Sequence, residues 1–245
     1  MPSNVTGAGV ELTYEERGTG RAVLLIHDMA GDRGSALHGG AALVGDARVI
    51  DYARRGYAGS GAPEPYDGTT VHEQAEDAAA VLASLAPQGA VVAGEGFGAL
   101  IALDLLLRHR PRVTAALLLD PQLLAFVPSA TRALADERER IEAALRAGGP
   151  QAGVDAWLDA REDRDGEAAR ASAHGFFADY AGLASWPVTR GELRSLDAPA
   201  IVLTHERTPA HIAAAADALA ELLPRAERRA DGDVAGALRA LLDAR

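Results

Sequence analysis

Three carboxyl residues and one histidine stand at or just after the ends of short apolar runs: Asp28, Glu95, Asp120 and His205. If these runs are parallel strands, their carboxyl ends share one edge of a sheet, which is where open α/β sheets bind ligands. Carboxyl groups held in different protonation states can divide acid and base work, and an imidazole can carry a proton near neutral pH. These four side chains are therefore the candidates for catalysis.

Strands and helices alternate along most of the chain, which predicts the sheet that positions these residues. We expect a hairpin strand over 10–16 and further strands near 22–27, 47–51, 90–93, 115–120, 200–204 and 225–229. Thr70 and Glu73 have the spacing of a capping box before a helical run at 75–85. The pattern predicts an α/β fold with a mostly parallel, doubly wound sheet of about seven to eight strands.

The segment Gly94-Glu95-Gly96-Phe97-Gly98 lies between an apolar strand and an apolar-periodic helix at 99–109. It matches the G-x-S-x-G nucleophile motif except that glycine stands where the serine belongs. Glycine tolerates the sharp strand-to-helix turn well but supplies no atom that could attack a substrate. The sequence therefore predicts a turn formed by Gly94, Gly96 and Gly98 that has no serine nucleophile.

Several segments around this turn resemble the α/β-hydrolase superfamily over nearly the whole chain. The segment 22–31 ends in His27-Asp28-Met29-Ala30-Gly31, which is similar to the family's strand ending in His-Gly-x-x-Gly. The segment 49–60 resembles the family's Asp-x-x-Gly-x-Gly-x-Ser segment with one residue inserted, and 115–121 and 199–204 are similar to two later strands. The chain resembles a divergent member of this family.

This resemblance implies a serine, acid and histidine triad, and the positions that correspond to it are Gly96, Thr208 and Asp233. None of the three carries the expected side chain, so ordinary serine hydrolysis is not expected. The resemblance also implies that the backbone amides of Met29 and Phe97 would bind an oxyanion, which requires no side chains. Because any helix N-terminus has free amides, these donors alone do not separate a catalytic site from a structural turn.

Each candidate catalytic residue also has a structural interpretation. Asp28 replaces a glycine of the family pattern, and it would be a proton donor or base if the cap buries it but a turn aspartate if it points outward. Glu95 could face loop backbone, Asp120 begins a common Asp-Pro turn, and His205 could be a hydrogen-bonded histidine at a strand end. Some members of the family carry their acid at the strand that Asp120 ends, but without a serine and a histidine it would have nothing to orient.

Residues 122–191 show no strand pattern and are predicted to form a helical cap that roofs the pocket. The remaining residues, 1–121 and 192–245, then form the core. The expected cap helices are 129–147, 150–161 and 167–183. Gly148-Gly149-Pro150 separates the first two, because glycine stops a helix and proline is favoured in its first turn.

Aromatic residues concentrate in the last cap helix and its exit: Phe176, Phe177, Tyr180 and Trp186. Together with His27 they predict a flat apolar lining for an aromatic or polycyclic substrate. Their helical spacing offers another interpretation, in which the rings dock the cap on the core, and core packing is the usual fate of aromatic side chains.

Composition limits the classes of partner. The formal net charge is −11 and no basic stripe is visible, which argues against nucleic acid. The chain has no cysteine, no apolar run long enough to span a membrane and no export leader, so no membrane association and a cytoplasmic location are expected. The histidines lack metal-ligand spacing, and neither a metal nor a cofactor is expected. The expected partner is a small-molecule substrate or ligand, and a homodimer is left open.

These observations favour a pseudo-hydrolase of secondary metabolism that acts on an apolar, polycyclic or polyketide-like molecule. Its chemistry would be cofactor-independent and of the isomerase, lyase or cyclase type. A second hypothesis is a non-catalytic protein that binds a small molecule without changing it. A third is a serine hydrolase inactivated at position 96, natural or engineered, against which the absent histidine and acid of the triad argue.

Overall fold

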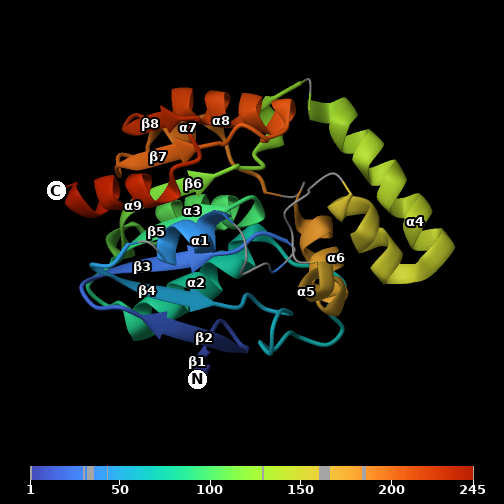
Figure 1. The fold of residues 1–245 in the computed structure, drawn as a ribbon, viewed down its shortest axis with the longest axis horizontal. Coiled ribbons are helices and arrows are strands. Elements are labelled where there is room, and N and C mark those ends of the chain that lie inside the picture. The colour runs from blue at the N-terminus through green and yellow to red at the C-terminus, as the bar shows by residue number, and fades with distance from the viewer. Residues whose placement is uncertain are drawn as a thin grey trace.

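A sheet of eight strands runs through the centre of the computed structural model (Figure 1). The structure describes residues 2–29, 31, 36–42, 44–128, 130–159, 166–183 and 186–244. The strands are β1 (Ser3–Thr6), β2 (Glu11–Arg17), β3 (Arg21–Ile26), β4 (Ala47–Tyr52), β5 (Ala90–Glu95), β6 (Val113–Leu119), β7 (Ala200–Leu203) and β8 (Ala226–Arg229). Their order is β1-β2-β4-β3-β5-β6-β7-β8. The pairs β1–β2 and β2–β4 are antiparallel and the others are parallel, which confirms the predicted sheet.

Helices cover both faces of this sheet, so the central strands are buried on both sides. One face carries α1 (Ala36–Ala42) and α9 (Val234–Asp243), and the other carries α2 (Val71–Leu85), α3 (Phe97–Arg108) and α8 (Ala210–Leu222). Alternation along β3 shows this division, because Val23 and Leu25 pack on the α1 side and Leu24 and Ile26 on the α3 side. Thr70 begins α2 as predicted, with its hydroxyl accepting from the Glu73 amide.

The chain between β6 and β7 contains helices and loops over its described residues. These helices are the short η2 (Leu124–Phe126), α4 (Ala130–Leu158), α5 (Gly166–Ala171), α6 (Ala173–Gly182) and α7 (Arg190–Arg194), while η1 (Arg110–Arg112) precedes β6. The α4 helix breaks at Gly149, where φ is 80°, as the sequence predicts. The last predicted cap helix is divided at Ser172 into α5 and α6. Figure 1 shows α4, α5 and α6 to one side of the sheet.

In the part of the chain that the structure describes, no helix is both long enough and apolar enough to cross a membrane.

Candidate functional site

The turn from β5 into α3 has the sharp geometry that the sequence predicts. Its central residue, Gly96, has φ 57° and ψ −114°, a conformation that residues with a β-carbon rarely adopt. Gly98 permits close packing, because a β-carbon there would overlap the carbonyl oxygen of Ile26 in β3. A β-carbon on Gly94 would likewise overlap backbone atoms of Gly98. The glycines therefore let α3 begin directly after the carboxyl end of β5.

The carboxyl group of Asp28 fills the space beside Gly96. A β-carbon on Gly96 would overlap the Cγ and both carboxyl oxygens of Asp28. Asp28 comes from the loop that follows β3, and only 2% of its surface is exposed. Its carboxyl therefore lies where a larger residue at position 96 would place its own side chain.

Two donors surround this carboxyl group. The backbone N–H of Phe97, the first residue of α3, donates to Oδ1 of Asp28 over 2.8 Å. The amide Nε2 of Gln122, which follows β6, lies 3.5 Å from both carboxyl oxygens. The positive end of the α3 dipole also favours a negative charge at this point. The amide that the family resemblance assigns to an oxyanion thus holds the protein's own carboxylate.

A buried arginine supports the loop that carries Asp28. Arg54, just after β4, donates from Nε to the carbonyl of His27 over 3.0 Å and from Nη2 to the carbonyl of Asp28 over 3.1 Å. Its backbone N–H donates to Nε2 of His27, and Nδ1 of the same ring lies 2.7 Å from the carbonyl of Asp28. These partners assign the ring proton to Nδ1. Both ring nitrogens of His27 are bonded to backbone, which does not support its predicted role in binding substrate.

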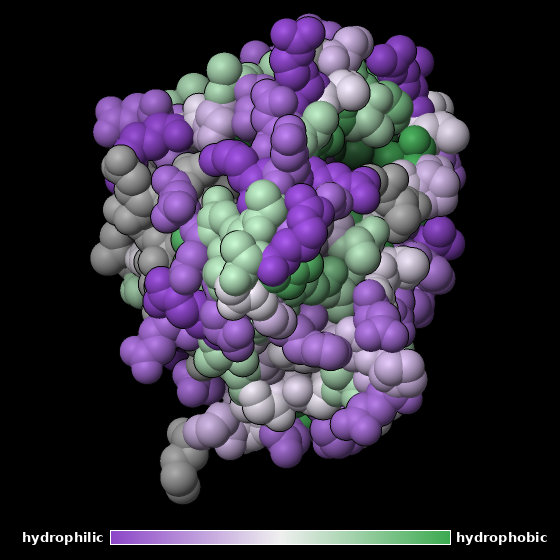
Figure 2. All heavy atoms as spheres, turned by 90° about the vertical axis from the view of Figure 1, so that its right-hand side faces the viewer, coloured by the Kyte–Doolittle hydropathy of each residue, from purple (hydrophilic) through white to green (hydrophobic). Residues whose placement is uncertain are grey.

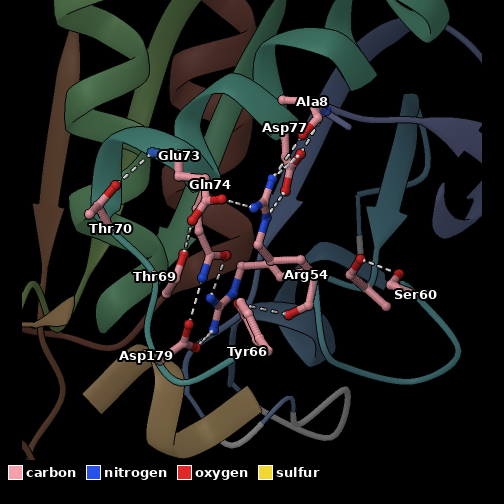
Figure 3. A network of polar contacts seen from close by, with 12 residues as sticks. Ala8, Arg54, Ser60, Tyr66, Thr69, Thr70, Glu73, Gln74, Asp77 and Asp179 are labelled. Atoms are coloured by element: carbon pink, nitrogen blue, oxygen red, sulfur yellow. Dashed lines mark hydrogen bonds and ion pairs between the residues drawn. The ribbon is translucent and has the colours of Figure 1, made fainter. Parts of the chain in front are cut away.

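An internal ion pair links Arg54, which supports this loop, to Asp179 of α6 (Figure 3). Nη2 of Arg54 lies 2.6 Å from Oδ2 of Asp179, and both side chains are fully buried. The Tyr57 hydroxyl, which lies 2.5 Å from the carbonyl of Met29, is also 2.7 Å from Oδ2 of Asp179. Gln74 donates to Oδ1 over 2.5 Å. Burial raises the pKa of Asp179, and the Arg54 guanidinium opposes that shift by stabilising the carboxylate.

A second polar group forms at the carboxyl ends of β6 and β7. Nε2 of His205 lies 3.0 Å from Oδ2 of Asp120, and the Thr208 hydroxyl donates to Oδ1 of Asp120 over 2.7 Å. Nδ1 of His205 accepts from the backbone N–H of Arg207 over 3.1 Å. The hydrogen bond to Asp120 raises the pKa of His205; partial burial opposes this shift and the charge of Glu95 adds to it. Asp120 therefore does orient a histidine, which comes from the neighbouring strand.

The two positions that the resemblance assigns to the triad acid and histidine have structural contacts. Thr208 binds Asp120 as described, and its hydroxyl also accepts from the backbone N–H of His205 over 2.9 Å. Asp233 is the N-cap of α9, with Oδ1 accepting from the Gly236 amide over 2.8 Å. Both side chains are therefore bonded to the protein itself.

The aromatic residues of the predicted lining contact the protein itself. Phe176 is fully buried, and its ring centroid lies 5.1 Å from that of Phe177 and 5.9 Å from that of Tyr180. The indole N–H of Trp186 donates to Oδ1 of Asp104 in α3 over 2.9 Å. For Phe176 and Trp186, these contacts agree with the docking interpretation and do not support a role in lining a pocket.

Sequence analysis misses the residues that hold the Asp28 carboxyl and its loop in place: Arg54, Tyr57, Gln122 and Asp179. A signal was present for Arg54, because Arg54-Arg55 follows a strand that ends at the same sheet edge as the catalytic candidates. Asp179 carries a weaker signal as an acidic residue between Phe177 and Tyr180 in an otherwise apolar helix.

The groups assembled at this edge are carboxylates, an imidazole and a backbone amide, and their chemistry is proton transfer and hydrogen bonding. Among the residues that the structure describes, no three His, Asp or Glu side chains are grouped as metal ligands would be.

Comparison with known sequences finds one partial relative. No protein-family model matches the chain. The uncharacterized hydrolase YraK from Bacillus subtilis strain 168 is 34% identical over 119 residues, which are 49% of this chain and 44% of that protein. The matched segment thus spans less than half of either protein.

Comparison with solved structures finds similar folds along almost the whole chain. A hydrolase from Pseudomonas aeruginosa PA01 has a TM-score of 0.76 and 21% identity, with 99% of this chain and 98% of that one covered. An α/β hydrolase from Sphaerobacter thermophilus DSM 20745 has a TM-score of 0.75 and 22% identity, covering 98% and 99%. Est816, described as an N-acyl homoserine lactone degrading enzyme, has a TM-score of 0.68 and 27% identity, covering 98% and 95%.

Proposed function

Because the chain has the α/β-hydrolase fold, we propose that it is an enzyme in which the Asp28 carboxylate has replaced the serine nucleophile as the reactive group. The reaction is non-hydrolytic proton transfer on an apolar small molecule, of the isomerase, lyase or cyclase type, without a cofactor. The single observation that carries this proposal is the Asp28 carboxyl beside Gly96, bonded to the first amide of α3.

The position of Asp28 supports a role as general base. A carboxylate can take a proton from a carbon or oxygen acid of the substrate and return it to another atom of the same molecule, which is the balance of an isomerisation. Phe97 and Gln122 fix the carboxyl in place, and Arg54 fixes its loop. A rigid base needs little reorganisation when the proton moves, which favours catalysis.

The pair of His205 and Asp120 supports a second proton-carrying group at the same sheet edge. Because the pKa of His205 is raised, more of this imidazole is protonated near neutral pH than for an unperturbed histidine. Nε2 of His205 contacts Asp120 and its Nδ1 accepts from the Arg207 backbone N–H, so the protonated ring donates to a substrate oxygen once one of these contacts opens, while a carboxylate takes the proton from carbon. In this proposal Asp28 is the base, and His205 with Asp120 is the acid.

A non-catalytic binding protein is the second candidate. It is favoured by the same contact between Asp28 and the Phe97 amide, because the protein's own carboxyl already occupies the donor that an oxyanion would use. In that case the site would hold a ligand and transform nothing.

Inactivation of a serine hydrolase at position 96 has less support. A side chain on Gly96 overlaps Asp28, so a serine at this position requires the carboxyl to move. The hydrolase names of the similar proteins therefore do not extend to this chain as a serine mechanism.

The test compares Asp28→Asn with Asp136→Asn, which makes the same change at an exposed position of α4. Each protein is incubated with a panel of polycyclic and polyketide-like compounds, and bound and released compounds are analysed by native mass spectrometry and chromatography. We expect the unsubstituted protein and Asp136→Asn to alter one class of compound. Asp28→Asn should retain binding but lose about 100-fold or more in turnover, the usual contribution of a general base.

Two results would contradict the proposal. If Asp28→Asn turns over the substrate as fast as the unsubstituted protein, Asp28 is a turn residue. If a ligand binds tightly and is always recovered intact after long incubation at limiting amounts, the protein is a binding module.

A further inference from the structure

Gln122 contacts the Asp28 carboxyl, and its amide has a chemistry that the reaction proposed above does not use. The residue lies just after β6, and 8% of its surface is exposed. Its Nε2 lies 3.5 Å from each carboxyl oxygen of Asp28. A carboxylate attracts the N–H end of an amide and repels its oxygen, which assigns Nε2 to this side. In the described part of the chain, these two oxygens are the contacts of Nε2.

Both contacts of Nε2 are long. A hydrogen bond from nitrogen to oxygen usually spans about 2.9 Å, so a contact at 3.5 Å is weak. The backbone N–H of Phe97, in contrast, donates to Oδ1 of Asp28 over 2.8 Å. A primary amide also has two N–H donors. Gln122 can therefore turn an N–H to a ligand oxygen at little cost, whereas Phe97 would first have to release Asp28.

The distance between Nε2 of Gln122 and Oδ2 of Asp28 suits a carbonyl compound. In a ketone the oxygen and the α-carbon are about 2.4 Å apart, as ordinary bond lengths require. A donor reaches the oxygen from about 2.9 Å, and a base reaches the carbon from about 3–3.5 Å. A donor and a base that lie 3.5 Å from each other can therefore contact both atoms of one ketone at once.

The backbone before Gln122 has an unusual conformation. Asp120 has φ 46°, in the left-handed region that residues with a β-carbon seldom adopt, and Pro121 follows it. The Asp120 carboxyl contacts His205, whereas the Gln122 amide, beyond the proline, contacts Asp28. Conformations of this kind cluster at active sites, where the surrounding structure holds them. The turn places the proposed acid and the Gln122 amide at the same edge of the sheet.

The charges at this edge favour an uncharged ligand. Asp28, Glu95 and Asp120 bring carboxyl groups to it, and these would repel a ligand that is itself a carboxylate. The Arg54 guanidinium is already paired with Asp179 of α6, a helix that lies over this edge. The face formed by the cap helices shows apolar groups among hydrophilic side chains (Figure 2). An apolar, neutral molecule therefore suits the site better than an acid.

We infer that Gln122 is a catalytic residue and that the substrate is an uncharged, apolar ketone with an acidic α C–H bond. The carbonyl oxygen accepts from Nε2 of Gln122 while the Asp28 carboxylate takes the α proton. This inference rests on the proposed function, because it needs Asp28 as the base.

The step balances within the protein and the ketone. Oδ1 of Asp28 holds the Phe97 N–H, so Oδ2 takes the proton. The electron pair of the C–H bond forms a carbon–carbon double bond, and the π pair of the carbonyl moves to the oxygen that Gln122 binds. Asp28 is then neutral and does not repel the enolate. Return of the proton to the same carbon gives exchange, and return to a conjugated carbon gives an isomer. An amide does not give up its proton, so protonation of the oxygen remains the role of His205.

The first experiment follows deuterium exchange at the α-carbons of 2-tetralone, a neutral bicyclic ketone, in D2O by NMR. We expect the unsubstituted protein to exceed the buffer rate and Asp28→Asn to lose this activity. Gln122→Met keeps the length of the side chain but removes the donor. It should lower kcat about 100-fold with little change in KM, the usual effect of losing one oxyanion donor. Gln88→Met, in an exposed turn before β5, is the matched control and should exchange as fast as the unsubstituted protein.

The second experiment separates donation to the ligand from support of the Asp28 carboxylate. Asp28→Asn imitates the uncharged side chain that follows proton transfer, and 2-naphthol has the planar shape and the oxygen of the 2-tetralone enol. In the Asp28→Asn protein, adding Gln122→Met should raise the Kd for 2-naphthol about tenfold and leave the Kd for naphthalene unchanged. If Gln122 only held the Asp28 carboxylate in place, neither Kd would change. Fluorescence titration measures both.

A second variant at the same position guards against misfolding. Gln122→Asn keeps a polar amide in the buried position but withdraws the donor by about 1.5 Å, the length of one C–C bond. It should fold like the unsubstituted protein and still lose at least tenfold in kcat. Thermal unfolding of each variant checks that it is folded.

Three results would overturn the inference: no exchange of 2-tetralone above the buffer rate, exchange that both Gln122 variants leave unchanged, or an unchanged Kd for 2-naphthol in the double variant. Exchange that needs Asp28 but not Gln122 would leave the proposed function standing. Absence of any turnover that depends on Asp28, with 2-tetralone and with the compound panel above, would remove both.

Discussion

The two polar groups at the carboxyl edge of the sheet, one around Asp28 and one around His205, are built in opposite ways. Asp28 is buried. Its carboxyl accepts from a backbone amide and contacts Gln122, and Arg54 donates to its backbone carbonyl. His205 is 30% exposed in its side chain and is held by another titratable side chain, Asp120. Steric packing determines the position of the Asp28 carboxyl, whereas the charge of Asp120 determines the position of the His205 ring.

This difference indicates how each group should respond to change. A buried, closely packed group is destabilised when a neighbour is removed, because buried polar atoms lose their partners, and when a neighbour is enlarged, because the atoms then overlap. A partly exposed pair of charges responds mainly to pH and salt, and its energy is small because water screens it. The three predictions below test this division.

The largest effect is expected for Arg54→Met. This substitution leaves Asp179 buried without its counter-charge and removes the donors of the His27 and Asp28 carbonyls. Breaking a buried pair from one side costs about 3–5 kcal/mol, and we expect urea unfolding to show a loss of that size. Arg146→Met on the surface is the matched control. A loss below about 1 kcal/mol would mean that the packed group does not depend on its arginine.

A smaller effect is expected for Gly96→Ser. The added side chain overlaps Asp28, and overpacking of this kind costs about 1–3 kcal/mol. Replacing Asp28 by glycine should remove this overlap, so the double variant Asp28→Gly with Gly96→Ser should be more stable than Gly96→Ser alone. Thermal unfolding of the two single variants and the double variant measures this coupling. Strictly additive changes would show that the two residues do not compete for one space.

The smallest effect is expected for His205→Gln, and it should depend on pH. The pKa of His205 is raised by Asp120, so the folded state favours the protonated ring. The stabilisation is complete below the pKa of an unfolded-state histidine and is lost as the pH rises through the raised value. The variant should therefore be less stable than the original by up to about 1 kcal/mol at pH 6 and equal to it at pH 9. A larger difference at pH 9 would contradict the assigned contact.

Much of the fold could be predicted from the sequence because β3, β5, β6 and β7 are almost continuous apolar runs. The run 22–27 predicts β3, whose residues after Arg21 are all buried, and the run 115–120 predicts most of β6. Strand β1 was not predicted, because Val5 is its sole buried residue and an edge strand with one buried residue has no hydrophobic periodicity.

The sequence predicted which residues belong to the candidate site, but it did not predict how they contact one another. The end of each strand indicated Asp28, Asp120 and His205, and the Gly96 turn was visible as a motif. The contact between Asp28 and the Phe97 amide joins segments 69 residues apart, and the Arg54–Asp179 pair joins segments 125 residues apart. No local pattern encodes such contacts, because they depend on how segments far apart in the sequence pack against one another.

The shared space of Asp28 and Gly96 restricts the order in which this pair of residues can change. A chain with serine at 96 and aspartate at 28 has two side chains in one volume, whereas a chain with glycine at both positions has none. Because the state with both side chains is overpacked by about 1–3 kcal/mol, a stepwise exchange between a hydroxyl and a carboxyl at this point is less strained when it passes through the state with two glycines.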